Sequence, residues 1–174
     1  IMSSKDKGVN WEVGQPAYFN TNECQVVELS DSSLMLNMRE RSNRKRMEGN
    51  GRAISVTTDM GTKWTEHSTS RNALIEPACQ GCLYRHNYTE NGVKKHILLF
   101  SNPNSKEFRI NHTIKVSFDD GMTWPKEHWI LFDQYRSAGY SCITSIDENS
   151  IGILYESSQS DLAFIKIDLT EILK

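Results

Sequence analysis

The chain of 174 residues has a hydrophobic content of 37% and a formal net charge of -2. These values fit one ordinary folded domain with a core of its own. A charge so close to neutrality gives no electrostatic case for binding nucleic acid or an anionic membrane surface. No apolar run approaches the roughly 20 residues needed to span a bilayer. The most basic run, Arg39 to Arg46, is interrupted by Glu40 and reads as a solvated loop, with Arg39 itself set apart.

The predicted elements, in chain order, are nearly all strands. The start at Ile1 reads like the middle of a strand and turn, so we expect an incomplete or processed chain. Two runs, 24–29 and 33–39, flank Ser30-Asp-Ser32, which is a hairpin signal. Further strands are predicted at 53–57, 96–101, 113–117, 129–132, 142–145, 151–156 and 163–167. Only the tail, 169–173, predicts a short helical turn.

One short pattern occurs three times along the chain. Its copies start at Ser4, Thr57 and Ser117, and each reads hydroxyl-x-Asp-x-Gly-x-x-Trp. A repeat of roughly 50 to 60 residues with four short strands per unit indicates propeller blades. Three blades are too few to close a ring, which typically has about four to eight. The remaining blades are expected upstream or in another chain.

The residue types of the repeat predict a tight turn. Gly supplies a position with positive φ, where a Cβ would clash. The Asp two residues earlier can accept backbone N–H bonds and lock the loop. The Trp is expected to return to the apolar side and pin the hairpin onto its neighbours. The pair Asp119-Asp120 lacks the ligand spacing of a calcium loop, so the copies are interpreted as structural turns, and no metal or other cofactor is predicted.

The cysteines give no redox or zinc signature. Of Cys24, Cys79, Cys82 and Cys142, only Cys79-Gln-Gly-Cys82 has metal or redox spacing. A zinc ribbon needs a second such pair, and a thioredoxin-like site needs a helix after the motif within a βαβ unit. Neither context is visible, so buried or strand-end thiols are predicted.

The repeated turn resembles the Asp-box of sialidases, which are six-bladed β-propellers. Non-catalytic propellers such as sorting receptors also carry Asp-boxes, so the order of further segments decides the match. Those segments are Asn22-Glu-Cys-Gln25, Leu36-Asn-Met-Arg39, Cys79-Gln-Gly81, Phe100-Ser-Asn-Pro103 with Phe108-Arg109, Ala138-Gly-Tyr-Ser141 and Leu154-Tyr-Glu156. Their order resembles the second half of the catalytic domain in the exo-sialidase family of bacteria and animals. The resemblance implies an all-β fold in which residues 1–174 form the C-terminal half of the domain, about three blades of four-stranded antiparallel sheets.

Two matched residues would carry the chemistry. The resemblance implies Tyr140 as the nucleophile and Glu23 as the carboxylate that takes its phenolic proton. Because sialic acid carries a carboxylate on its anomeric carbon, an acidic nucleophile would meet charge repulsion that a neutral phenol avoids. A phenol with a reference pKa of about 10 needs an adjacent base, and the positive field of the arginines is expected to ease its ionisation. The expected reaction removes terminal sialic acid from glycans by hydrolysis, with retention, through a covalent glycosyl-tyrosine.

Four further residues would hold the substrate. The resemblance implies that Arg39 and Arg109 are the second and third members of an arginine triad that binds the substrate carboxylate. Glu156 would orient the first arginine, and Gln80 would lie at the pocket edge. The first arginine, in an Arg-Ile-Pro segment, and an acid/base Asp are absent from this chain. In the family both lie in the N-terminal half of the propeller, which is therefore the expected partner alongside sialylated glycans.

Two other functions remain open from the sequence. A catalytically inactive Asp-box propeller would bind glycans or proteins, and it predicts loss of the Tyr, Glu or Arg set. A trans-sialidase would transfer the sugar to another glycan and would depend on acceptor-side aromatic residues. On family resemblance we expect a bacterial enzyme that is secreted or periplasmic.

Overall fold

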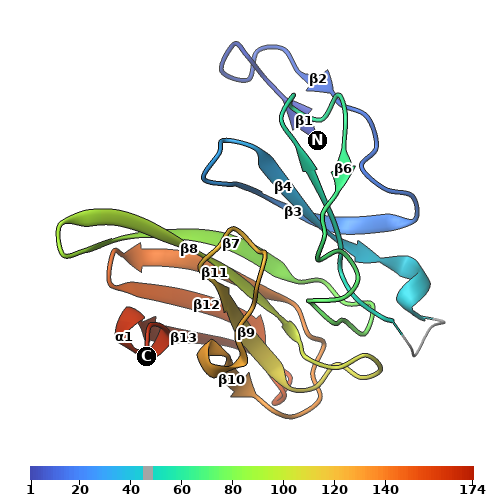
Figure 1. The fold of residues 1–174 in the computed structure, drawn as a ribbon. Coiled ribbons are helices and arrows are strands. Elements are labelled where there is room, and N and C mark those ends of the chain that lie inside the picture. Colours follow the sequence, from blue (N-terminus) through green and yellow to red (C-terminus); the bar gives the residue numbers. More distant parts are fainter. Residues whose placement is uncertain (45–48) are drawn as a thin grey trace.

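The computed structural model describes residues 1–44 and 49–174, in which antiparallel strands form four separate sheets (Figure 1). The strands are β1 (Met2–Ser3), β2 (Glu12–Val13), β3 (Thr21–Glu28), β4 (Leu34–Glu40), β5 (Ala53–Thr57), β6 (Thr65–Glu66), β7 (Cys82–Glu90), β8 (Val93–Pro103), β9 (His112–Ser117), β10 (Ile130–Asp133), β11 (Ser141–Asp147), β12 (Ser150–Glu156) and β13 (Leu162–Asp168). The helical elements are η1 (Arg41–Arg44), η2 (Lys126–His128) and α1 (Leu169–Ile172). The end of the basic run, Lys45 and Arg46, lies outside the described residues.

Each sheet is a meander of strands that follow one another in the chain. The sheets β3–β6 and β7–β10 have four strands each, whereas β11–β13 has three and β1–β2 has two. The prediction of an all-β fold of about three propeller blades is confirmed, with two blades complete in four strands. The innermost strands β3, β7 and β11 each lie at the edge of their own sheet, and β7 contacts both of the others. This places the three sheets side by side around those strands.

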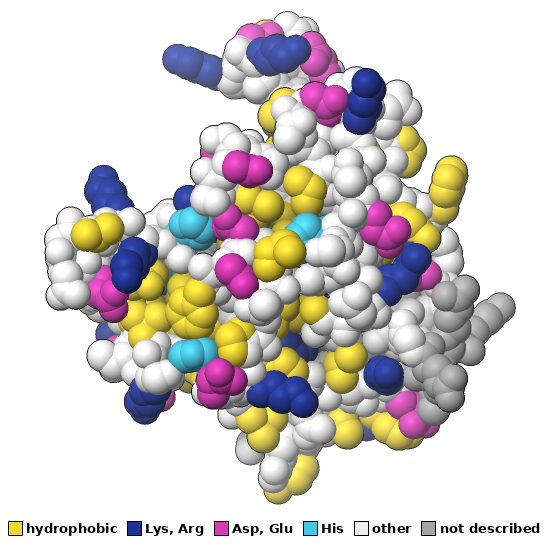
Figure 2. Space-filling view, in the orientation of Figure 1, with side chains coloured by type: hydrophobic (Ala, Val, Ile, Leu, Met, Phe, Trp, Pro, Cys, Tyr) yellow, Lys and Arg dark blue, Asp and Glu magenta, His cyan; other side chains and the backbone are white. Residues whose placement is uncertain are grey.

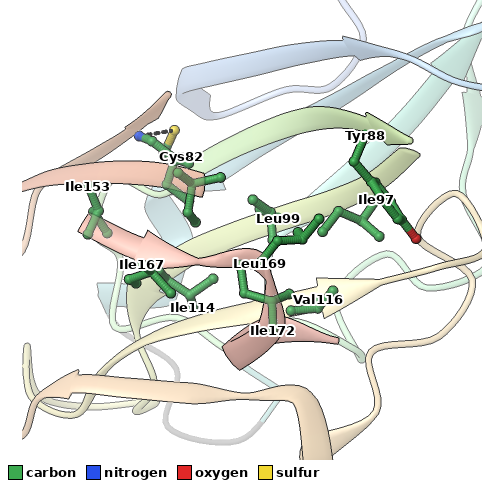
Figure 3. Close-up of a cluster of buried hydrophobic side chains, with 12 residues drawn as sticks. Cys82, Tyr88, Ile97, Leu99, Ile114, Val116, Ile153, Ile167, Leu169 and Ile172 are labelled. Carbon is green, nitrogen blue, oxygen red and sulfur yellow. Dashed lines mark hydrogen bonds between the residues drawn. The ribbon is translucent and has the colours of Figure 1, made fainter. Parts of the chain in front are cut away.

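The alternation of β8 explains how the sheets pack. Ile97 and Leu99 face one apolar cluster, and Leu98 and Phe100 face the other, so both faces of this strand are buried. The first cluster fills the space between sheets β7–β10 and β11–β13 and includes residues of α1 (Figure 3). The second cluster packs sheet β3–β6 against sheet β7–β10. The continuous apolar run that predicted this strand is therefore the run that holds the sheets together.

The three repeat turns have the predicted geometry. The glycines Gly8, Gly61 and Gly121 have φ values of 91°, 88° and 84°. In each copy the Asp accepts the backbone N–H four residues later, at 2.8 to 2.9 Å, and the hydroxyl of the first residue accepts the glycine N–H. These turns lead into the outer strands β2, β6 and, through η2, β10. The repeat is thus a self-contained turn that joins the third and fourth strands of a blade.

The tryptophans of the repeat differ from one another in burial. Trp124 is 8% exposed and packs against Phe100 in the second cluster, as predicted. Trp11 is 57% exposed and directly precedes β2 of the two-stranded sheet. Its indole N–H still donates to the carbonyl of Gly8 at 3.0 Å. Trp11 therefore closes its own turn and pins no neighbouring sheet among the described residues.

One long strand was not predicted. Strand β7 carries Arg85, His86 and Asn87 at its centre, which hides the apolar pattern of a strand. His86 is fully buried, and hydrogen bonds satisfy both of its ring nitrogens: Nδ1 lies 2.7 Å from the hydroxyl of Ser145 and Nε2 lies 3.2 Å from the carbonyl of Glu148. Burial at this position depends on hydrogen bonds, which a hydrophobic pattern does not report. The short C-terminal helical turn, by contrast, is confirmed as α1.

The surface matches the near-neutral charge. Figure 2 shows cationic and acidic side chains interspersed on the face drawn. None of the helices in the described residues has the length and apolar character to cross a membrane. All four cysteines are free, and Cys79 and Cys82 are buried thiols, as predicted.

Candidate active site

The structure brings three of the predicted site residues into direct contact. The hydroxyl of Tyr140 donates to Oε1 of Glu23, and Nη1 of Arg39 donates to Oε2 of the same carboxylate at 2.5 Å. The same Nη1 lies 3.4 Å from the Tyr140 hydroxyl. Glu23 and Arg39 come from neighbouring strands β3 and β4, whereas Tyr140 directly precedes β11. A phenol, a carboxylate and a guanidinium thus meet across two different sheets.

A β-bulge aims Glu23 at the phenol. Strand β3 pairs Asn22 with Arg39 and Gln25 with Asn37, so two residues of β3 lie opposite one residue of β4. Glu23 occupies the bulge with φ of 47°, a left-handed conformation that is uncommon outside glycine. Bulges re-aim a side chain relative to a regular strand. The regular alternation of β3 is broken at the residue whose carboxylate contacts Tyr140.

Tyr140 is fixed by the glycine before it and by strand β12. Gly139 has φ of 94°, and a Cβ there would lie 2.9 Å from Sγ of Cys79 and 3.1 Å from Pro103. The backbone N–H of Tyr140 donates to Oε2 of Glu156 at 2.9 Å, and the N–H of Glu156 donates back to the Tyr140 carbonyl at 3.0 Å. The Tyr140 side chain remains 37% exposed. The nucleophile candidate is therefore rigid at its backbone and open at its ring.

Arg39 is buried behind the phenol and the carboxylate. The residue is 3% exposed, and its Nε has no hydrogen-bond partner among residues 1–44 and 49–174. Buried polar groups in proteins almost always have a partner. Its charge is balanced by Glu23, which is itself only partly buried. Arg39 is thus held in place on one side and has unused hydrogen-bonding capacity on another.

The contacts shift the pKa values of all three groups. Burial would raise the pKa of Glu23, but the hydrogen bonds from Arg39 and Tyr140 outweigh it and lower that pKa. Burial would lower the pKa of Arg39, and the ion pair with Glu23 raises it above its ordinary value. The pKa of Tyr140 is raised, first by its hydrogen bond to Glu23 and then by burial, against the opposing charge of Arg39. The resting site therefore holds a protonated phenol beside an ionised carboxylate.

The charge of Arg39 acts on Tyr140 in the expected direction, but Glu23 outweighs it. The positive field of the arginines was expected to make the phenol easier to ionise, and Arg39 does act in that direction. The Glu23 carboxylate acts more strongly in the other direction, because a carboxylate that accepts the phenolic hydrogen bond favours the neutral phenol. Ionisation of Tyr140 therefore requires that its proton move to Glu23.

Arg109 lies on the same side of the molecule as Tyr140, but its contacts differ from those of Arg39. Its guanidinium carbon is 5.9 Å from the centre of the Tyr140 ring, and its Nη1 donates to the carbonyl of Ala138. The carbonyl of Arg109 accepts the N–H of Ser137 at 3.2 Å. Arg109 is half-buried in the loop between β8 and β9. It therefore braces the segment that carries Tyr140 and leaves part of its guanidinium exposed.

Gln80 and Glu156 contact the backbone around Tyr140. Both ends of the Gln80 amide bind Ser141: Nε2 donates to its carbonyl, and Oε1 accepts its N–H, each at 3.0 Å. The predicted role of Glu156, to orient an arginine from another segment, stays a prediction, as does a substrate contact of Gln80. In the described residues the two side chains hold the residues on either side of the start of β11.

Sequence reasoning missed a buried ion pair behind the site. Arg52 and Glu76 are both fully buried, and Nη1 of Arg52 lies 2.7 Å from Oε2 of Glu76. The same Nη1 donates to the carbonyl of Cys79 at 2.8 Å, and Nε donates to Oδ1 of Asn37 at 2.7 Å. Cys79 in turn packs where a Gly139 side chain would be, and burial raises the pKa of its thiol to about 11. The one available signal was a charged residue directly before an apolar strand.

Metal ligands are a separate matter. Within residues 1–44 and 49–174, no three His, Cys, Asp or Glu side chains are arranged to hold a metal ion.

Comparison with known proteins agrees with this fold and these contacts. A family model described as a BNR repeat-like domain matches residues 1–153. A sialidase of Bacteroides fragilis (strain YCH46) is 46% identical over 174 residues, which is 100% of this chain and 31% of that protein. A sialidase of Micromonospora viridifaciens is 32% identical over 155 residues, covering 88% of this chain and 23% of that protein. The chain therefore spans less than a third of either relative.

Solved structures give the same result. The Hadza microbial sialidase Hz136 is 42% identical with a TM-score of 0.86, covering 97% of this chain and 32% of that one. The intramolecular trans-sialidase from Ruminococcus gnavus is 26% identical with a TM-score of 0.66, covering 98% of this chain and 38% of that one. The chain belongs to the BNR repeat-like family. Its resemblance to sialidases, as part of a β-propeller domain, is confirmed.

Proposed function

We propose that the protein containing this chain is an exo-α-sialidase that removes terminal sialic acid from glycoconjugates by hydrolysis with retention. The observation that carries the proposal is the contact of the Tyr140 hydroxyl with the Glu23 carboxylate, with Arg39 bound to both. The similarity to sialidases supports the proposed activity. The contact of these three side chains supports the proposed mechanism, in which Tyr140 is the nucleophile.

In the first step, Oη of Tyr140 forms a bond to the anomeric carbon while the bond to the aglycone oxygen breaks. The phenolic proton moves to Glu23, which already accepts the hydrogen bond from that hydroxyl. A phenol suits this substrate because a carboxylate nucleophile would approach the negative charge beside the anomeric carbon. Water then forms a bond to the anomeric carbon as the bond to Oη of Tyr140 breaks, Glu23 returns the proton to the phenolate, and the two displacements give retention. The acid that protonates the leaving oxygen is expected from the N-terminal half of the propeller.

Arg39 and Arg109 are proposed to bind the substrate carboxylate. A guanidinium stays charged and its planar fork matches a carboxylate. Arg39 is supported by its buried Nε without a partner among the described residues, and Arg109 by its position beside the Tyr140 ring. Glu156 and Gln80 have backbone partners in the same region, so their proposed contribution to substrate binding is indirect.

The test is release of a fluorescent aglycone from an α-sialoside by the full-length protein. Tyr140→Phe should reduce turnover to background and leave binding of an unsaturated sialic acid analogue intact. Tyr135→Phe is the matched control, because Tyr135 is 65% exposed and outside the site. Full turnover in Tyr140→Phe would refute the nucleophile role. A protein that binds the sialoside but does not cleave it would favour the non-catalytic propeller.

Product analysis in the same assay separates hydrolysis from transfer. Free sialic acid as the sole product is expected from a hydrolase, whereas sialic acid attached to an added lactose would favour a trans-sialidase. Similarity in fold to a trans-sialidase does not identify residues of this chain that would bind an acceptor glycan. Hydrolysis is therefore the simpler proposal.

Residues 1–174 are proposed to be the C-terminal half of the catalytic propeller, and the N-terminal half their partner in the ring. Support comes from the two complete four-stranded sheets and from the 31% of the Bacteroides relative that the chain spans. We further propose a secreted or periplasmic bacterial enzyme. Fractionation of the producing cells, with activity measured in medium, periplasm and cytoplasm, tests that location.

A further inference from the structure

Strand β11 starts directly after Tyr140 and has one unpaired edge. It pairs with β12 on one side only, because it is the first strand of its three-stranded sheet. In an antiparallel pair, alternate residues direct their N–H groups away from the partner strand. Buried N–H groups at such an edge need other acceptors. The N–H groups concerned belong to alternate residues from Ser141 onward.

Side chains of the neighbouring sheet accept these N–H groups in strict order. The acceptors are alternate residues that begin just before β7, and each contact joins positions 61 residues apart. The pairs are Ser141 with Oε1 of Gln80 at 3.0 Å, Ile143 with Sγ of Cys82 at 3.3 Å, and Ser145 with the hydroxyl of Tyr84 at 3.1 Å. We call these three contacts the β7–β11 ladder; the dashed line at Cys82 in Figure 3 is its middle contact.

Gln80 makes the ladder contact that is nearest in sequence to Tyr140. Its amide holds both the N–H and the carbonyl of Ser141, the residue that follows Tyr140. Glu156 holds the N–H of Tyr140 from the other side. Two successive peptide units are thus fixed by side chains from two segments, one just before β7 and the other at the end of β12. Movement of Ser141 would displace the Tyr140 ring from Glu23, which belongs to a third sheet.

We propose that Gln80 is a positioning residue for Tyr140, acting through Ser141 at the first contact of the β7–β11 ladder. The proposal rests on the proposed function of Tyr140 as the nucleophile. Both polar ends of the Gln80 amide are already bound to backbone, so its action is on the nucleophile and not on the substrate. The distant end of the ladder, at Tyr84, supports the same strand but lies four residues further along it.

The experiment compares Gln80→Ala with Tyr84→Phe in the full-length protein, using the fluorescent α-sialoside. Both variants remove ladder contacts, so both should lower the urea midpoint of unfolding. Gln80→Ala should also lower kcat on the order of 10- to 100-fold, because small displacements of a reacting group are that costly. Its KM should stay within about twofold, since no substrate contact is lost. Tyr84→Phe should keep kcat within about twofold.

Two results would overturn the proposal. The first is an unchanged kcat in Gln80→Ala; a raised KM beside it would make Gln80 a substrate-binding residue. The second is an equal loss of kcat in both variants, which would indicate a structural role only. If the parent protein does not cleave sialosides, the proposed function fails, and the crystal structure of Gln80→Ala still decides the positioning: a Tyr140 hydroxyl displaced from Glu23 supports it, and an unchanged contact overturns it.

Discussion

Gly139 offers the sharpest test of how the backbone places Tyr140. An alanine at this position must adopt φ of 94°, and its Cβ would lie 2.9 Å from Cys79, 3.1 Å from Pro103 and 3.3 Å from Arg109. The left-handed backbone costs about 1–2 kcal/mol for a residue with a Cβ. Overpacking against three neighbours costs a further 1–3 kcal/mol or so. Gly139→Ala should therefore reduce the free energy of unfolding by about 2–5 kcal/mol.

Gly92→Ala separates the two contributions. Gly92 also has a positive φ, 76°, but no atom lies within 4 Å of the position that its Cβ would take. This variant should lose only the backbone contribution of about 1–2 kcal/mol. Urea unfolding of both variants measures the difference, and sialoside turnover should fall in Gly139→Ala alone.

A second substitution, added to the Gly139→Ala variant, tests whether contact with Cys79 causes part of its loss of stability. Because Sγ is the nearest atom to the new Cβ, Cys79→Ala should restore part of the stability that Gly139→Ala loses. Equal losses in Gly139→Ala and Gly92→Ala would refute the reasoning, because contact with the buried thiol would then contribute nothing.

Three further predictions follow from charges at and behind the site. Glu23→Gln should lower kcat on the order of 10²- to 10⁴-fold, and in the unaltered protein the loss of kcat/KM at acid pH should have its midpoint below pH 4.5, because the pKa of Glu23 is lowered from that value. Glu76→Gln should lower the free energy of unfolding by about 3–5 kcal/mol in urea unfolding, because it leaves the charge of Arg52 buried without its partner. Lys115→Met should remove a rise in stability between about pH 7 and pH 10.5, since burial lowers the pKa of Lys115 from 10.5 to about 7.

Proton linkage fixes the direction of the pH effect predicted for Lys115. Between pH 7 and 10.5 the unfolded chain binds the Lys115 proton and the folded chain does not, so stability rises with pH in that window. The comparison is the urea midpoint of the Lys115→Met variant minus that of the parent at pH 7 and pH 10; a constant difference would count against a neutral buried lysine. Persistence of the acid limb of kcat/KM in Glu23→Gln would exclude Glu23 as its origin. A stable Glu76→Gln variant would show that Arg52 finds another partner.

The sequence was a good guide to the strands and turns because those depend on local patterns. The run 96–101 was predicted as a strand from its apolar character, and the structure shows why that character is continuous: residues 97–100 alternate between two clusters. The repeat turns were predictable because hydroxyl, Asp and Gly act within five residues of one another. Strand β7 was not predictable, because His86 is buried through hydrogen bonds to residues about sixty positions away.

For the candidate site, the sequence predicted which residues take part but not how they are brought together. Motif order brought together Tyr140, Glu23 and Arg39, and the structure places them in contact. The means of that contact were hidden: the bulge at Glu23 reverses the expected alternation of its strand, and Gly139 is needed because of a thiol sixty residues earlier. Such requirements arise between sheets, and a one-dimensional pattern carries no record of which side chain will approach which backbone.

The contact between Tyr140 and Glu23 joins the residue directly before β11 to strand β3, and both β11 and β3 contact the edge strand β7 of the sheet between them. Turnover therefore depends on how sheets β3–β6, β7–β10 and β11–β13 pack together, as well as on the chemistry of the site. Separation of β3 or β11 from β7 would pull the two residues apart before the sheets themselves unfold, and we expect this docking to be lost first. As denaturant is added, activity should then disappear while the amides of β8, buried on both faces, are still protected from exchange.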